Sequence, residues 1–129
     1  MPLVRIDVQQ GRTPSQLREV ADTVQEVMLD VFAAPPRDRY QIITEHPLGQ
    51  IIAEDTGLGL ERSDGVTVIQ IFQQGRSVEQ KQAAYEQLAK RLDAAGLVRP
   101  EDLIVSVVAN AREDWSFGLG RAQFLTGEL

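Results

Sequence analysis

The chain contains no cysteine, and only one of its 129 residues is histidine. Without thiols it can form no disulfide, hold no metal through thiolates and use no cysteine nucleophile. No apolar run approaches the roughly 18 residues of a membrane-spanning helix, and no basic, apolar leader precedes the first expected strand. A net charge of −6, with acids and bases mixed along the chain, argues against a nucleic-acid or anionic-lipid partner. We therefore expect a cytoplasmic, globular protein with a single domain over residues 1–129.

A five-residue phrase occurs twice, 64 residues apart. Residues 9–13, which read QQGRT, return as residues 73–77, which read QQGRS, and each copy lies between an expected strand and an expected helix. A repeat at a fixed offset indicates a duplicated supersecondary unit. The same offset places Pro2 opposite Val66, so only the first unit begins with a proline that lies directly behind the initiator methionine.

Alternation of apolar and polar residues predicts a strand over residues 3–8. The sequence from Thr13 to Gln16 has the form of a capping box with proline at the first helical position, and it predicts a helix over 14–32 that ends before Pro35. The second unit shows a second capping box at Ser77 and a glycine suited to a helix end at position 96. The remaining expected strands are 39–45, 51–55, 66–72, 103–109 and a short one at 123–126.

These elements predict an α/β (α+β) fold in which two βαβ repeats, approximately 1–64 and 65–129, form a mixed four-stranded sheet with two helices on one face. The strands at 66–72 and 103–108 are apolar on both faces, whereas two helices can cover only one face. We expect other copies of the same chain to cover the second face, and therefore a homo-oligomer.

Pro2 is the first candidate for chemistry. Removal of Met1 would leave a secondary amine, and a terminal amine has an ordinary pKa near 8. Such an amine can act as a base when burial lowers its pKa, as an acid when a carboxylate holds its proton, or as a nucleophile that forms an iminium with a carbonyl. Proline at position 2 can also be a translational accident, although here it starts a strand of the repeat.

Three further positions have both a structural and a functional interpretation. Asp38 lies in a charged turn that can simply be solvated, or its carboxylate can stabilise the protonated amine. Arg76 lies where a strand leads into a helix and can bind an anion, but its repeat mate Arg12 favours a structural role. Trp115 is a core or interface anchor by default and otherwise part of an apolar wall. His46 has no nucleophile or metal partner in the sequence, and we assign it no catalysis.

Taken together, five ordered segments resemble the tautomerase superfamily, and most closely its malonate semialdehyde decarboxylase branch. They are residues 1–3 (MPL), 36–41 (PRDRYQ), 54–59 (EDTGLG), 114–118 (DWSFG) and 122–127 (AQFLTG). The resemblance covers the whole chain. It implies a homotrimer built from two βαβ units, a small carboxylate-bearing substrate, catalysis by the N-terminal proline, and no metal or organic cofactor.

The resemblance also assigns roles to individual residues. Pro2 would be the catalytic amine, Asp38 its carboxylate partner and Arg76 the residue that binds the substrate carboxylate. The better-known members carry a second arginine where this chain has Gln74, which can hydrogen-bond a carboxylate but adds no charge. The apolar wall of the substrate site would consist of Trp115, Phe117, Phe124 and Leu129.

The resemblance implies decarboxylation of malonate semialdehyde, or of a close short β-keto acid, to acetaldehyde and CO2. A cationic Pro2 would stabilise the developing enolate, and an iminium route would use the same residues. The alternatives are a phenylpyruvate-type keto–enol tautomerase with neutral Pro2 as base, a hydratase or dehalogenase of short unsaturated acids, and an oligomeric scaffold that retains the fold without activity.

Overall fold

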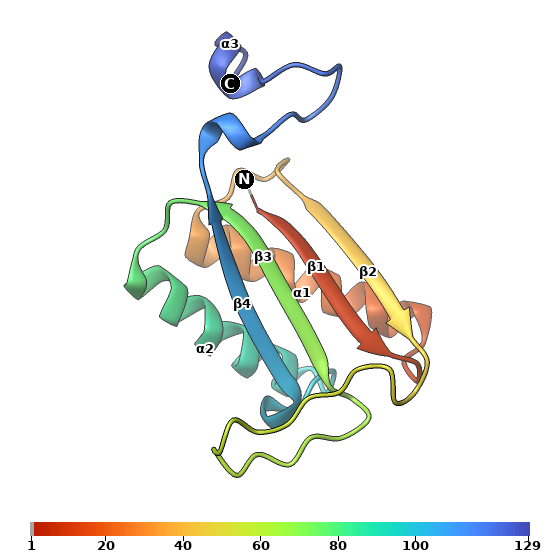
Figure 1. The fold of residues 1–129 in the computed structure, drawn as a ribbon. Coiled ribbons are helices and arrows are strands. Elements are labelled where there is room, and N and C mark those ends of the chain that lie inside the picture. The colour runs from red at the N-terminus through yellow and green to blue at the C-terminus, as the bar shows by residue number, and fades with distance from the viewer. Residues whose placement is uncertain (1) are drawn as a thin grey trace.

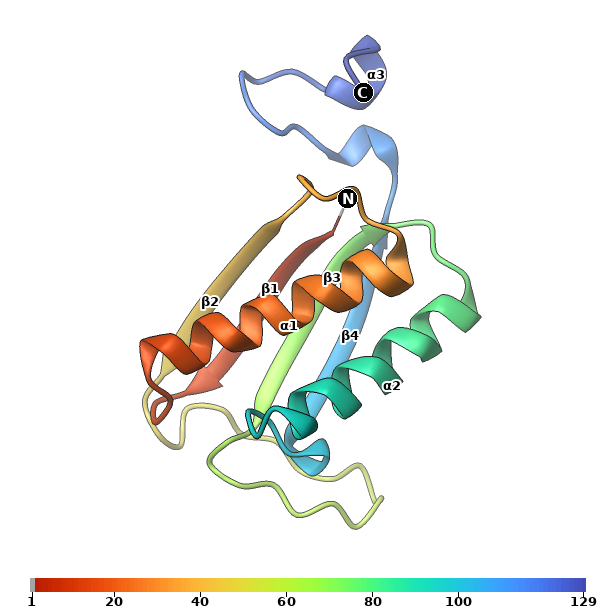
Figure 2. The same cartoon turned by 180° about the vertical axis from the view of Figure 1, so that it is seen from behind.

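The computed structural model describes residues 2–129 and shows a twisted four-stranded sheet with two long helices lying across one face (Figure 1, Figure 2). The main elements are β1 (Leu3–Gln9), α1 (Pro14–Phe32), β2 (Tyr40–His46), β3 (Thr67–Gln74), α2 (Val78–Ala94) and β4 (Leu103–Asn110). Three short elements complete the chain: the 3₁₀ turns η1 (Pro100–Asp102) and η2 (Arg112–Asp114), and the helix α3 (Gln123–Thr126).

The strand order in the sheet is β2-β1-β3-β4. Within each βαβ unit the strands are parallel, β1 with β2 and β3 with β4, and the two units meet through the antiparallel pair of β1 and β3. This arrangement confirms the predicted mixed four-stranded sheet with both helices on one face.

Both long helices begin with the predicted capping boxes. Thr13 Oγ1 accepts from the Gln16 amide at 3.1 Å while the Gln16 side chain accepts from the Thr13 amide at 2.9 Å. Ser77 and Gln80 make the same two bonds at 3.1 and 3.0 Å. Each box satisfies two backbone donors that a helix start otherwise leaves unpaired, so the sequence repeat extends to matching hydrogen bonds.

The core lies between the sheet and the two helices. Alternate residues of the central strands point into it, and their neighbours on the helices have the predicted 3.6-residue spacing. Fully burying one such aliphatic side chain contributes about 1.5–3 kcal/mol. The largest members are Val4, Ile6, Val8, Val20, Val24, Met28, Phe32, Ile69, Ile71, Leu88 and Leu92.

The opposite face of the sheet carries no helix (Figure 1). The strand register places Tyr40, Leu3, Phe72 and Val108 in one row across this face. The side chain of Val108 is 40% exposed and that of Ile42 is 47% exposed. These exposed apolar side chains form the face that the expected oligomer would cover.

None of the helices among the described residues is long and apolar enough to cross a membrane.

One expected strand is wrong: residues 51–55 form a loop instead. The Ile51 amide, which a strand would pair with a neighbour, donates to the side chain of Gln9 at 3.3 Å. Further along, the Asp55 carboxylate accepts from the amides of Gly57 and Gly59 at 3.2 and 2.8 Å and folds the chain back on itself. Local side-chain bonds of this kind compete with strand pairing.

The strand expected at 123–126 is also wrong, because these residues form the short helix α3. The carbonyl of Ala122 accepts from the amides of Leu125 and Thr126 at 2.9 and 3.0 Å. Gly127 ends the helix with a φ of 84°, a left-handed conformation that glycine adopts without strain.

The candidate residues gather at one end of the sheet. The start of β1, the end of β3, the loop after α1 and the segment after β4 meet at the end where the N-terminus and α3 lie (Figure 1). The long connection between β2 and β3 lies at the opposite end.

Candidate functional site

A cavity of about 320 Å³ lies at this end of the molecule. The loop after α1, the end of β3 with the turn that follows it, and the C-terminal segment each contribute to its walls. Five of the residues singled out from the sequence are therefore brought together, although they are distant in the chain. The lining residues are Pro35, Asp38, Gln74, Arg76, Phe124 and Leu129.

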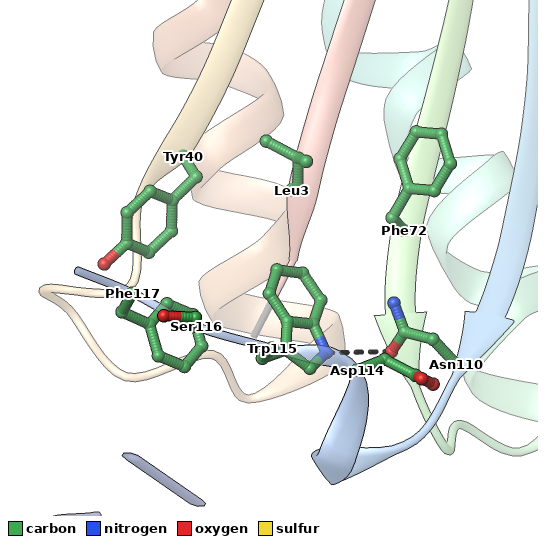
Figure 3. A pocket seen from close by; sticks show the side chains of 8 residues that line it. All are labelled: Leu3, Tyr40, Phe72, Asn110, Asp114, Trp115, Ser116 and Phe117. Atoms are coloured by element: carbon green, nitrogen blue, oxygen red, sulfur yellow. Dashed lines mark hydrogen bonds between the residues drawn. The ribbon is translucent and has the colours of Figure 1, made fainter. Parts of the chain in front are cut away.

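A second cavity, of about 420 Å³, lies on the open face of the sheet, beside the start of β1 at Leu3 and the start of β2 at Tyr40. Figure 3 shows Trp115 beneath Leu3, with its indole nitrogen donating to Asn110 Oδ1 at 2.9 Å. Phe117 stacks on Trp115 at 5.4 Å between ring centroids and meets Phe124 edge-on, also at 5.4 Å. The aromatic residues expected to form one apolar wall are therefore in contact with one another, with Phe117 lining the second cavity and Phe124 lining the first.

Asp38 enters the first cavity from the loop after α1, where its amide donates to the carbonyl of Pro35 at 2.9 Å. Its Oδ2 atom is buried and receives no hydrogen bond from residues 2–129. Burial raises the pKa of Asp38 above the ordinary aspartate value because it disfavours the charged form. A buried carboxylate oxygen without a donor costs free energy, so Asp38 is set to accept a proton or a hydrogen bond from a further group.

Arg76 is held firmly by backbone carbonyls. Its Nε donates to the carbonyl of Phe32 at 3.1 Å, and Nη1 donates to the carbonyls of Gln74 and Gly75 at 2.8 Å each. Burial lowers its pKa from 12.5, and its guanidinium lies 5.7 Å from the ring centroid of Phe32. Of five N–H groups, only those on Nη2 remain for other partners, so Arg76 offers a ligand its charge but not a two-pronged fork.

Gln73 is a site residue that the sequence reasoning missed. It is only 1% exposed and lies at the end of β3, on the face that packs against the helices. When its amide oxygen faces the guanidinium, Oε1 accepts from Arg76 Nη1 at 3.1 Å and Nη2 at 2.7 Å, and Nε2 lies 3.3 Å from the nitrogen of Pro2. The opposite orientation would turn amide N–H groups toward guanidinium N–H groups and leave one long contact of 3.4 Å to the Gln74 carbonyl.

A signal for Gln73 was present in the sequence. Strand alternation puts it on the same face as Ile69 and Ile71, so a polar side chain was due to be buried there. A buried amide needs partners, and those partners prove to be two of the predicted site residues.

Pro2 itself is buried next to the start of β1, and through Gln73 it is connected to Arg76. The expected removal of Met1 concerns a residue outside the described range. Pro2, Asp38, Gln74, Arg76 and the aromatic wall thus share one region of the molecule, which leaves their individual roles as a proposal.

The equivalent place in the other half of the fold is a smaller cavity, of about 200 Å³, whose lining includes Arg12 and Asp102. There Val66 takes the place that Pro2 has in the first unit. Arg12 donates its N–H groups to the carbonyls of Leu97 and Gly65 at 2.9–3.0 Å. Gln9 is likewise bonded to the backbone, with Nε2 donating to Asp64 and Oε1 accepting from the amide of Gly49. Both copies of the repeated phrase therefore line a cavity, but in the first copy Gln9 and Arg12 are bonded to backbone groups, and only the second copy lines the cavity that holds Asp38.

No group of three or more His, Cys, Asp or Glu side chains within residues 2–129 could hold a metal ion. The arrangement instead offers a fixed cation, an unpaired carboxylate oxygen, a buried proline and an aromatic wall. Such a set can bind a small anion, desolvate it and exchange a proton with it.

Comparisons with known proteins agree with this geometry. Two family models, both described as tautomerase enzyme, match residues 38–118 and residues 2–61. "Probable tautomerase YrdN" of Bacillus subtilis (strain 168) is 46% identical over 129 residues, which is 100% of both chains.

Two solved structures of malonate semialdehyde decarboxylases are similar in fold and in sequence. One, described with decarboxylase and hydratase activities, is 42% identical, covers 98% of each chain and has a TM-score of 0.94. The other, the FG41 enzyme inhibited by 3-bromopropiolate, is 44% identical, with 98% of this chain and 97% of the other covered and a TM-score of 0.94. The fold, the cavity and these likenesses lead to one conclusion: the chain belongs to the tautomerase family.

Proposed function

We propose that this tautomerase-family enzyme decarboxylates malonate semialdehyde, or a close short β-keto acid, to acetaldehyde and CO2. The reaction uses Pro2 after removal of Met1 and needs no metal or organic cofactor. The observation that carries the proposal is the cavity that places the unpaired Oδ2 of Asp38 together with the cation of Arg76.

Binding follows from the charges in the cavity. The substrate carboxylate accepts from the remaining Nη2 donor of Arg76 and from the side-chain NH2 group of Gln74, both of which belong to residues that line the cavity. The ring of Phe124 lines this cavity and packs against Phe117, and this apolar side shields the carboxylate from water, which favours its loss as neutral CO2. A volume of about 320 Å³ suits an acid of a few carbons.

The chemistry follows from the N-terminal amine. The bond between the carboxylate carbon and its neighbour breaks, and its electron pair moves into the carbonyl to give an enolate, which then takes a proton on carbon to yield acetaldehyde. Cationic Pro2 stabilises the negative oxygen of this enolate. Asp38 keeps Pro2 protonated, because an anion nearby raises the pKa of an amine. In the alternative route, neutral Pro2 attacks the carbonyl and water is lost to form an iminium. The iminium then accepts the electron pair of the breaking carbon–carbon bond, and its hydrolysis releases acetaldehyde.

A keto–enol tautomerase is the second candidate. One observation favours it: when the amide oxygen of Gln73 faces Arg76, its nitrogen lies 3.3 Å from Pro2 N, and once Met1 is removed this donor favours the neutral amine that a general base requires. The name of the 46% identical relative points the same way. Hydration of short unsaturated acids is a third possibility, since one of the similar structures is described with a hydratase activity.

The exposed sheet face supports a further part of the proposal, which is assembly into a homotrimer. Apolar side chains on β2 and β4 remain exposed in the single chain, among them Ile42 and Val108. Contiguous exposed apolar surface of this kind marks interaction sites in soluble proteins, and a second copy of the chain supplies the same apolar chemistry.

The test is a substrate panel on one preparation whose mass shows that Met1 is gone. We expect kcat/KM for malonate semialdehyde to exceed that for phenylenolpyruvate and for a short acetylenic acid by at least about tenfold, a difference of 1.4 kcal/mol in transition-state stabilisation. A higher kcat/KM for phenylenolpyruvate would replace decarboxylation by tautomerisation as the function.

A further inference from the structure

Gln73 stands between the two cations that the proposed function requires. When its amide oxygen faces the guanidinium, Oε1 accepts from Arg76 at 2.7 and 3.1 Å, and Nε2 lies 3.3 Å from Pro2 N, which becomes an amine once Met1 is removed. The side chain is 1% exposed, so water is not available to replace either partner. An amide has one carbonyl oxygen, and it can turn that oxygen toward Arg76 or toward a protonated Pro2, but not toward both.

We propose that Gln73 is a positioning residue that couples carboxylate binding at Arg76 to protonation of Pro2. This inference rests on the proposed function for the use of the two cations, and it concerns a residue to which that function gives no part. In the free protein the amide oxygen is held by Arg76, and the amide nitrogen offers Pro2 a donor. That donor needs a lone pair on Pro2 and therefore favours the neutral amine.

Carboxylate binding reverses the preference. A substrate carboxylate accepts from the second N–H of Arg76 Nη2, and as an anion it competes with Gln73 Oε1 for that nitrogen and weakens their 2.7 Å bond. Once released, the amide can rotate and present Oε1 to the proline N–H. Pro2 then takes a proton from solvent and becomes the cation that stabilises an enolate. By linkage, protonation of Pro2 must strengthen carboxylate binding by the same factor.

The repeat provides an internal comparison. Gln9, at the matching position in the first unit, bonds only to backbone groups, with contacts of 3.2 Å to the carbonyl of Asp64 and 2.7 Å to the amide of Gly49. Arg12 makes no bond with it and is itself held by carbonyls. The two glutamines of the repeat thus differ in their partners: Gln9 bonds to backbone groups, whereas Gln73 contacts an arginine side chain and a proline nitrogen.

Other charges also act on Pro2, and the test must separate them from the amide. Asp38, in the loop after α1, favours the protonated amine, whereas Arg76, after β3, disfavours it. Arg112 of η2 lies 4.9 Å from the ring centroid of Phe124, which lines the same cavity. All three remain in place when Gln73 alone is replaced.

The experiment is a ¹⁵N NMR titration of protein labelled at proline, in which only the N-terminal amine among the six prolines titrates. It is run with and without 3-hydroxypropionate, a three-carbon carboxylate with no carbonyl and therefore no decarboxylation. In Gln73→Met, which keeps the length of the side chain but loses the donor, we expect the free-protein pKa of Pro2 to rise by about half to one pH unit, the worth of one hydrogen bond. The ligand should raise the pKa of Pro2 more in the parent protein than in this variant.

An unchanged free-protein pKa in Gln73→Met, or an equal response to the ligand, would overturn the coupling. If this variant does not fold, Gln73→Glu replaces it: its two oxygens can serve both cations, so we expect a raised pKa of Pro2 and a weaker response to the ligand, and a full response would reject the proposal. The control is Gln9→Met, expected to lower Tm and leave the pKa of Pro2 unchanged. Because no turnover is measured, the coupling can fail while decarboxylation is observed, or hold while it is not.

Discussion

Asp38 and Asp102 are 64 positions apart and precede matching strands, yet only one of them is satisfied by the protein. Asp102 is 1% exposed, and its carboxylate accepts from the amide of Ser63 at 2.7 Å and from the hydroxyl of the same residue. Asp38 Oδ2 is buried and receives no hydrogen bond from any described residue. Duplication has therefore left one carboxylate that stabilises the fold and one that is available for chemistry.

Neutral replacements should separate these two roles. Asp38→Asn is expected to keep the fold and to lose about 10²–10³-fold in kcat, the usual effect of removing one electrostatic contributor to a transition state. Asp102→Asn is expected to keep kcat and to lower the free energy of unfolding by about 1–3 kcal/mol, because buried donors lose their acceptor. Steady-state kinetics and urea denaturation of both variants test this, and equal effects on kcat would contradict it.

The raised pKa of Asp38 predicts a pH-dependent cost to stability. A carboxyl whose pKa is raised by folding contributes most at low pH, where it is protonated, and its contribution is lost as pH rises through the folded pKa. The free energies of unfolding of the parent and of Asp38→Asn should therefore agree below about pH 4, the ordinary range of aspartate. Above that, the variant should become the more stable protein. The comparison is made on protein that retains Met1, in which Pro2 is an amide and cannot act as the cationic partner of Asp38, and a parent that is more stable than the variant at pH 7 in this form would contradict the raised pKa.

Replacing Gln74 by arginine should strengthen binding of the substrate carboxylate. Gln74→Arg places a second cation beside the substrate carboxylate, and we expect KM for malonate semialdehyde to fall by about tenfold, in line with one additional charge-assisted hydrogen bond. Gln10→Arg, at the matching position of the first unit, is the control and should leave KM unchanged. An unaltered KM in Gln74→Arg would mean that the carboxylate binds elsewhere in the cavity.

The open sheet face predicts the behaviour of a charged variant. Val108→Asp puts a carboxylate in the apolar row formed with Phe72 and Leu3, and burying that charge in an interface without a partner is costly. We expect the parent to sediment as a trimer and the variant to sediment as a monomer at micromolar concentration. Ile52→Asp, in the long loop, is the control and should remain assembled. A monomeric parent would contradict the proposed assembly into a trimer.

The fold was largely predictable because its signals are local. The capping boxes at Thr13 and Ser77 and the apolar stripe along α1 placed both long helices, and the repeat indicated two βαβ units with parallel strands within each. The two errors, at 51–55 and 123–126, occurred where side-chain bonds of Asp55 and two backbone bonds to the Ala122 carbonyl, one from i+3 and one from i+4, overrode a β-like composition.

The candidate residues could be named from motifs, apart from Gln73, but their contacts could not be predicted. Asp38 and Arg76 line one cavity, Trp115 and Phe117 line the other, and their roles remain a prediction. That Arg76 is mostly bound to carbonyls, and that Gln73 links it to Pro2, depends on how β3 ends against the C-terminus of α1. Such contacts between distant segments leave no pattern in a single sequence.

The most direct measurement is proton NMR of the mature protein, with its loss of Met1 verified by intact mass, incubated with malonate semialdehyde beside Pro2→Ala. We expect the parent to form acetaldehyde at a rate at least about 10²-fold above the rate of Pro2→Ala, which is the lower range for loss of an acid–base group. Equal rates for the two proteins, or no acetaldehyde from either, would contradict decarboxylation by the N-terminal proline.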